Sequence, residues 1–244
     1  TSVSILVFAA SALSQGEVVS RVPAVSTAAR FDVSPPLRTM KPDLSTKAKK
    51  AEDDKGLDGP VGDFHHSPDG ALQSTTGTGV FTSESLIPNT LANFGGMGGL
   101  GSTPPDPNGD IGPNHYVQMV NSRFQIFTRA GVSVYGPSNI NTLFANFGGP
   151  CQLENAGDPV ILYDQFADRW LLSQFTDGTG PFFNCVAIST TGDPTGTYYR
   201  YAFETPAFPD YPKYGIWPTA YFLNTRENGG GVLGNIALDR AAMI

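Results

Sequence analysis

The chain has 244 residues, of which 28 are glycine and 20 are proline, while charged residues make up only 15%. This length allows one or two domains, and the composition falls short of that of a wholly disordered chain. The formal net charge of −7 at pH 7 argues against a nucleic-acid partner, because phosphate binding needs clustered lysine and arginine.

The first residues have the pattern of a secretory signal peptide. Residues 5–12 read ILVFAASA, an apolar run that ends in an A-x-A step of small residues. Neither an initiating methionine nor a basic segment precedes the run. We therefore predict that residues 1–12 are the remnant of a signal peptide, with a short buried strand as the alternative. The run is too short for a membrane-spanning helix, which needs about 20 apolar residues.

Residues 13–85 show neither a helical nor a strand period over any length. Proline, serine, threonine, lysine and aspartate dominate residues 34–78, so the segment cannot bury enough apolar surface to offset its chain entropy. The basic residues at 47–50 are followed at once by acidic residues at 52–54, as in a solvated segment rather than a nucleic-acid-binding arm. We predict a disordered linker or pro-segment here.

Residues 86–244 are predicted to form one all-β domain. Short alternating apolar runs appear here, each bounded by glycine, proline, asparagine or aspartate, which is typical of strands joined by turns. Turn residues at 129–131 and 192–196 indicate two hairpins. The predicted strands cover residues 115–120, 124–128, 133–135, 160–163, 170–175, 184–189, 198–203, 215–217, 220–224 and 232–238.

An internal repeat gives the strongest prediction of architecture. The pentapeptide ANFGG at residues 92–96 recurs at residues 145–149, and Asp-Pro at residues 106–107 recurs at residues 158–159, with Asp210 at the same interval of 52 residues beyond. A β-rich repeat of this length is typical of propeller blades. We predict a partial β-propeller of about 2.5 four-stranded blades. A β-sandwich is the alternative, because its two sheets also contain regular short strands.

The number of repeats leads to a further expectation. Propellers close with at least four blades, and an open stack would leave strand edges without partners. We therefore expect a fragment of a longer protein, truncated at its C-terminus, whose missing blades would be its partners within the chain.

Three stretches resemble a group of exported bacterial proteins, mostly uncharacterised, that look like sialidase-type (BNR, Asp-box) β-propellers. They are residues 104–118 (PPDPNGDIGPNHYVQ), 157–170 and 188–199. The resemblance implies the propeller fold and a secreted or cell-surface location more firmly than it implies an activity. The Asp-box pattern Ser-x-Asp-x-Gly is matched only in part, because Gly196 follows Asp193 one residue too late. The arginine triad that sialidases need cannot be assigned.

The three aspartates of the repeat are the first candidate site. Asp106, Asp158 and Asp210 each precede a strand at the same place in their unit. In a propeller this place can face the central channel, where converging carboxylates can bind Ca²⁺ or act as the acid and base of glycoside cleavage. The alternative is that each aspartate only caps a turn.

A calcium site is a related possibility. Asp106, Asn108 and Asp110 have the spacing of the first half of a calcium-binding loop, but Ile111 and Val117 stand where an EF-hand needs glycine and glutamate. An EF-hand is excluded, and a looser Ca²⁺ site remains the only cofactor that the sequence suggests.

Aromatic residues suggest a ligand-binding face. Tyr199, Tyr201 and Phe203 share one face of a predicted strand, with Arg200 between them. Trp170, at the start of another predicted strand, is a further candidate for ligand binding. Aromatic faces bind sugar rings well, although aromatic residues are also common in ordinary sheet packing.

Cys151 and Cys185 are the only cysteines and are predicted to form a disulfide, which fits an exported protein. Common protease, esterase and redox motifs are absent, so whether the protein is an enzyme stays open. The first functional hypothesis is a module that binds an extracellular polymer, most simply a glycan. The alternatives are a sialidase-like glycoside hydrolase that uses the three aspartates, and a structural cell-surface domain.

Overall fold

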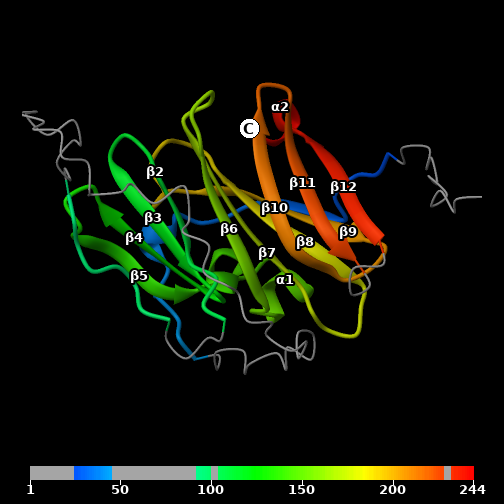
Figure 1. The fold of residues 1–244 in the computed structure, drawn as a ribbon, viewed down its shortest axis with the longest axis horizontal. Helices are drawn as coiled ribbons and strands as arrows, with labels where there is room; N and C mark the ends of the chain where they lie inside the picture. Colours follow the sequence, from blue (N-terminus) through cyan, green and yellow to red (C-terminus); the bar gives the residue numbers. More distant parts are fainter. Residues whose placement is uncertain (1–24, 46–91, 100–103, 228–231) are drawn as a thin grey trace, which may run out of the picture.

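Figure 1 shows the computed structural model, which describes residues 25–45, 92–99, 104–227 and 232–244. In these residues the chain is an all-β protein of three antiparallel sheets with a few short helices, which confirms the all-β part of the predicted fold. No helix of this described part is long and apolar enough to cross a membrane. The predicted signal-peptide remnant, residues 1–12, lies outside the described residues.

The three sheets follow one another along the chain, and within each sheet the strands are consecutive in sequence except for β1. The first sheet contains β2 (Asn108–Ile111), β3 (His115–Val120), β4 (Arg123–Thr128) and β5 (Ser133–Asn139). The second sheet contains β6 (Gly157–Asp164), β7 (Arg169–Phe175), β8 (Phe182–Ser189), β9 (Tyr198–Thr205) and, beyond β9, β1 (Arg30–Val33). The third sheet contains β10 (Pro209–Trp217), β11 (Ala220–Glu227) and β12 (Val232–Asp239).

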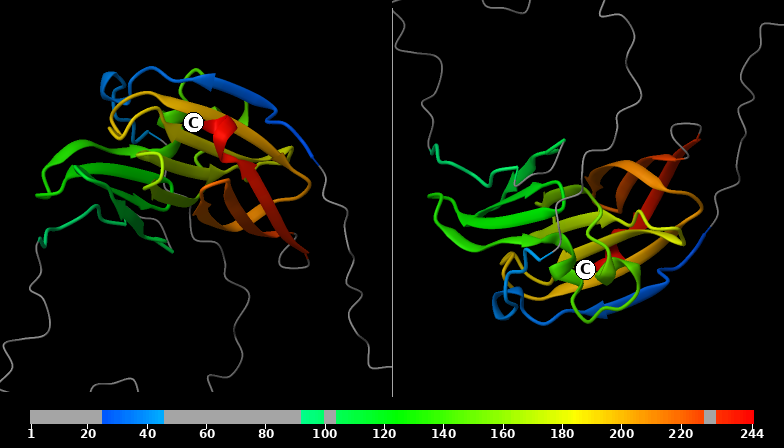
Figure 2. Two further views of the ribbon diagram at one scale, coloured as in Figure 1. Left: turned by 90° about the horizontal axis from the view of Figure 1, so that it is seen from above. Right: turned by 90° about the horizontal axis from the view of Figure 1, so that it is seen from below.

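The sheets bury their apolar faces in two hydrophobic cores. The larger core contains Phe124 of β4 in the first sheet together with Trp170 and Leu172 of β7 in the second. The other core joins the second and third sheets through side chains such as Ile188 of β8 and Tyr221 of β11. The first strands of the three sheets are neighbours, since β6 contacts both β2 and β10. Figure 2 shows the first sheet in green and the third in orange to red at opposite ends of the molecule.

One strand belongs to the segment that the sequence predicts to be a linker. β1 pairs antiparallel with β9 and forms the outer edge of the second sheet. After it, the short 3-10 helix η1 (Leu37–Thr39) places Leu37 in the larger core. The prediction of a linker without regular structure over residues 13–85 is therefore wrong for this part. A four-residue strand is too short to show the alternation that marks a strand in a sequence.

The other strands agree well with the sequence. The ten strands predicted between residues 115 and 238 correspond to β3 through β12, with ends that differ by a few residues. The sequence missed β2, whose residues Asn108, Gly109 and Asp110 belong to types that are uncommon in strands. The strand preferences of single residues therefore do not predict β2, which is held by hydrogen bonds to the second sheet.

The predicted disulfide is present. Cys151 lies in the short helix α1 (Pro150–Leu153), and Cys185 lies in β8, with 5.7 Å between their Cα atoms. Both side chains are buried in the larger core. The bond therefore ties α1, together with the 3-10 helix η2 (Ile140–Phe144) that contacts it, to the second sheet. The remaining helix, α2 (Arg240–Met243), follows β12.

Candidate functional site

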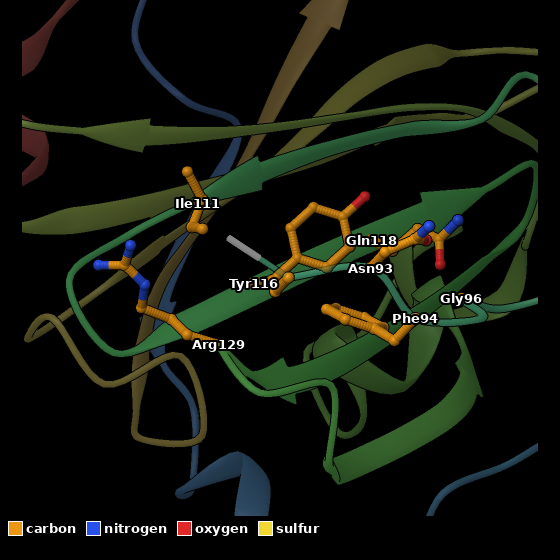
Figure 3. A pocket seen from close by; sticks show the side chains of 8 residues that line it. Asn93, Phe94, Gly96, Ile111, Tyr116, Gln118 and Arg129 are labelled. Carbon is orange, nitrogen blue, oxygen red and sulfur yellow. The ribbon is translucent and has the colours of Figure 1, made fainter. Parts of the chain in front are cut away.

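A cavity of about 700 Å³ opens on the outer face of the first sheet (Figure 3). In β3, Val117 and Met119 point into the larger core, so Tyr116 and Gln118 point to the opposite face, because successive side chains alternate across a strand. A segment that precedes the sheet, residues 92–96, forms another wall of the cavity. The lining residues are Ala92, Asn93, Phe94, Gly96, Ile111, Tyr116, Gln118 and Arg129.

Tyr116 lies at the centre of this pocket (Figure 3). Its ring extends over Gly109 of β2, where a Cβ atom would collide with the phenol oxygen. Phe94 packs edge-on against it, with ring centroids 6.0 Å apart, and Phe127 lies beneath at 6.2 Å. Burial, reinforced by the negative charge of Asp110, raises the pKa of Tyr116. The phenol is therefore protonated at neutral pH and can donate a hydrogen bond.

The segment that carries Phe94 is held in place by Gln118. The backbone N–H of Met97 donates to Oε1 of Gln118 over 2.6 Å, and the side chain of Met97 is buried. This bond orients the amide of Gln118, so that its Nε2 group remains available as a donor. Gln118 and Asn93 thus give one end of the pocket a polar lining (Figure 3).

Arg129 stands at the other end of the pocket, next to Ile111 (Figure 3). It lies in the turn after β4, is exposed, and donates from Nη1 to the carbonyl oxygen of Pro113 over 3.3 Å. The pocket therefore combines an aromatic centre with amides at one end and a guanidinium group at the other. Such an arrangement suits a ligand with a flat apolar face and a polar rim.

In the structure, two of the three aspartates of the repeat share a partner and the third does not. Asp106 and Asp158 are both left-handed residues, with φ values of 41° and 40°. They share one partner, Asn121, whose Nδ2 donates to Oδ2 of Asp106 over 3.0 Å and whose Oδ1 accepts from the backbone N–H of Asp158 over 3.2 Å. Asp210 instead forms an ion pair with Arg226. These contacts favour the turn interpretation, and a catalytic role stays a prediction.

The predicted calcium ligands connect the first two sheets. Asn108 donates from Nδ2 to the carbonyl oxygen of Pro159 over 2.7 Å and accepts at Oδ1 from the N–H of Ile161 over 2.9 Å. Asp110 accepts at Oδ2 from the N–H of Tyr163 over 2.7 Å. The oxygens of Asn108 and Asp110 therefore hold β2 against β6. Within the described ranges, no group of three His, Cys, Asp or Glu residues is placed to hold a metal ion. Calcium binding stays a prediction.

The predicted aromatic face on β9 packs against the neighbouring strand β1. Tyr199 and Tyr201 stack on Phe31 of β1, with ring centroids 6.4 and 4.9 Å apart. Arg200, which points to the opposite face, is 1% exposed and donates two 2.7 Å hydrogen bonds to the carboxylate of Asp32. Trp170 is fully buried. These contacts favour the packing interpretation of all four residues.

Sequence reasoning therefore missed the residues that line the pocket. Tyr116 lies in the predicted strand 115–120 and Phe94 in the repeated pentapeptide, and neither stood out as a candidate for binding. Alternation along β3 was the available signal, because Tyr116 and Gln118 face away from Val117 and Met119. Neither Phe94 nor Arg129 could be placed beside Tyr116 without the fold.

Comparisons with known proteins add no further assignment to this geometry. No family model, no curated protein and no solved structure matches the chain. Any functional conclusion must therefore be drawn from the pocket itself.

Proposed function

We propose that the chain is an extracellular glycan-binding domain of the β-propeller type, and that the pocket around Tyr116 is its binding site. The observation that carries this proposal is the accessible aromatic pair of Tyr116 and Phe94 between Arg129 at one end and Gln118 with Asn93 at the other. A sugar ring offers an apolar face to an aromatic side chain and hydroxyl groups to the polar side chains around it. The cavity volume is also in the range of small-ligand sites.

The arrangement of the sheets supports the propeller part of the proposal. Each sheet is a simple antiparallel meander, apart from the added β1, and the first strands β2, β6 and β10 are neighbours. Consecutive sheets pack face to face through the two cores. Blades of a propeller have this strand order and pack in this way.

The extracellular location is supported by the disulfide. Cys151 and Cys185 form a buried disulfide bond, and such bonds persist in oxidising compartments outside the cytosol. The A-x-A pattern in residues 10–12 supports the same location.

The hydrolase alternative has weaker support. A glycoside hydrolase of the expected kind needs two carboxyl groups that flank one bond. Asp210, however, is paired with Arg226, whereas Asp106 bonds to the side chain of Asn121. The structural-domain alternative predicts that the pocket binds no ligand at all, and the binding experiment decides it.

The test is a glycan-binding measurement with the variant Tyr116→Ala. A glycan array identifies neutral and acidic oligosaccharides that the wild-type chain binds, and titration calorimetry then compares the variants. We expect Tyr116→Ala to weaken binding about tenfold or more, because a central aromatic anchor contributes more than about 1 kcal/mol to affinity.

Trp217→Ala is the matched control, because Trp217 is an exposed aromatic residue on the third sheet. It should leave binding unchanged. Loss of binding in the control with retention in Tyr116→Ala would move the site to the third sheet and refute the proposal. Absence of binding to any glycan on the array would favour a structural domain.

A further inference from the structure

We infer that the ligand of the Tyr116 pocket carries a carboxylate, as in a uronic-acid polysaccharide, and that Arg129 binds this carboxylate. The inference rests on the proposed function, since it names the class of glycan for that site. Its starting point is the position of Arg129 at the end of the pocket beside Ile111 (Figure 3).

The hydrogen bonding of Arg129 leaves most of its donors unused. A guanidinium group has five N–H donors arranged to match a carboxylate. In the part of the chain that the structure describes, Arg129 forms one hydrogen bond, to the carbonyl oxygen of Pro113 over 3.3 Å. Within this described part the remaining donors stay available to a ligand, and none of the described residues that line the cavity is acidic.

Four other arginines of the described residues are paired with carboxylates. Arg38, Arg200, Arg226 and Arg240 each form an ion pair with an aspartate: Asp193, Asp32, Asp210 and Asp164, respectively. Arg38 and Arg226 are as instructive as the buried Arg200 and Arg240, because their side chains are more than half exposed and still have a carboxylate partner. Arg129 differs from these four in facing a cavity instead of an aspartate.

The positions of the polar side chains around Tyr116 suit a sugar ring that carries one carboxylate. Arg129 and the amides of Gln118 and Asn93 lie on opposite sides of Tyr116 (Figure 3). A pyranose ring that lies on Tyr116 can therefore direct a carboxylate to Arg129 and its hydroxyl groups to the amides. Charge-assisted bonds between arginine and carboxylate are about twice as strong as neutral hydrogen bonds.

The charge of the chain favours a carboxylate over a more densely charged group. Because the formal net charge is −7, the repulsion of an anionic chain grows with the number of charges that each sugar carries. Arg129 is the only cationic side chain among the residues described as lining the cavity. One guanidinium group matches one singly charged carboxylate per sugar. Highly sulfated chains need several basic residues in a cluster.

The experiment uses a pair of ligands that differ only in charge: a galacturonate oligomer and its methyl ester. Calorimetry compares wild-type protein, Arg129→Gln and the control Arg38→Gln, which removes an exposed arginine from another part of the surface. We expect the wild-type chain to bind the acid about tenfold more tightly than the ester, in line with a hydrogen bond to a charged group. Arg129→Gln should abolish this preference, and Arg38→Gln should preserve it.

The outcomes separate the inference from the function on which it rests. If acid and ester bind equally, and Tyr116→Ala weakens both, the glycan site stands and the carboxylate inference is overturned. Tighter binding of a sulfated galactan oligomer than of the galacturonate would overturn it in favour of sulfate. Should neither ligand bind while sedimentation shows a dimer that Tyr116→Ala dissociates, the pocket is an interface between copies, and both conclusions fail.

Discussion

Tyr116 and Trp170 occupy the same position in two successive sheets but have different surroundings. Each is the second residue of the second strand of its sheet, β3 and β7. The first sheet packs over Trp170 and buries it in the larger core, whereas Tyr116 faces the open pocket. The repeated pentapeptide shows the same difference, because Phe147 is buried in that core while Phe94 is half-buried beside Tyr116. Equivalent positions thus serve as core or as site according to whether a neighbouring sheet covers them.

The largest expected effect is a difference in stability between variants at Trp170, which is buried, and at Tyr116, which faces the pocket. Trp170→Ala should lower the free energy of unfolding by about 3–5 kcal/mol, because it leaves a large cavity in a packed core. Tyr116→Ala should lower it by only about 1 kcal/mol, since much of its ring faces the pocket rather than the core. Urea denaturation monitored by circular dichroism measures both. Equal losses in the two variants would mean that the Tyr116 face is as fully packed as the Trp170 face.

A second effect concerns the disulfide in the larger core, on the face of the first sheet opposite to the pocket. Replacing Cys151 and Cys185 together by alanine should lower the free energy of unfolding by about 3 kcal/mol, because the bond closes a 34-residue separation. The pocket lies on the opposite face of the first sheet, so glycan binding measured well below the unfolding transition should be retained. If the double-alanine variant stays folded but loses binding, the two faces are coupled and the comparison breaks down.

The smallest effect is expected at Asp164, the last residue of β6. Burial would raise the pKa of this carboxyl, but hydrogen bonds from Arg240 and Tyr221 outweigh it and hold the pKa below its ordinary value of 3.8. Its stabilising contribution is therefore complete above about pH 4 and is lost as the pH falls further, through the lowered pKa. The measurement is the free energy of unfolding between pH 6 and pH 3.

Asp164→Asn is the matched variant for that measurement. It should be less stable at pH 6, and it should lose less stability than the wild-type chain between pH 4 and pH 3. An identical pH dependence in the two proteins would show that other carboxylates control acid unfolding.

The sequence was most informative where strands alternate regularly. The run that forms β11 has this alternation of buried and exposed residues. β7 and β8 are instead buried along almost their whole length and were predictable as short apolar runs bounded by turn residues, while the two cysteines indicated their own pairing. β2 escaped detection because Asn108 and Asp110 are held by bonds to β6 rather than by strand preference. The pocket could not be predicted because Phe94 and Tyr116 are far apart in the sequence, and only the fold brings their rings into contact.

The contacts that favour packing over ligand binding on β9 could not be read from the sequence for a related reason. Tyr199 and Tyr201 are suitable for binding a sugar, but Phe31 reaches them from a segment more than 160 residues earlier in the chain, where Asp32 pairs with Arg200. Burial of this kind depends on long-range pairing, which a single sequence does not reveal. Composition shows which side chains are suited to a site, and topology decides which of them remain accessible.

The strand β1 has a consequence for the order in which the protein assembles. Synthesis produces residues 30–33 early, yet the edge to which they bind exists only after β9 has been made and paired with β8. Contacts between distant parts of a chain form late. Residues 30–33 therefore cannot pair until most of the domain has been synthesised. The addition of β1 to the edge of the second sheet therefore marks the completion of that sheet rather than its beginning.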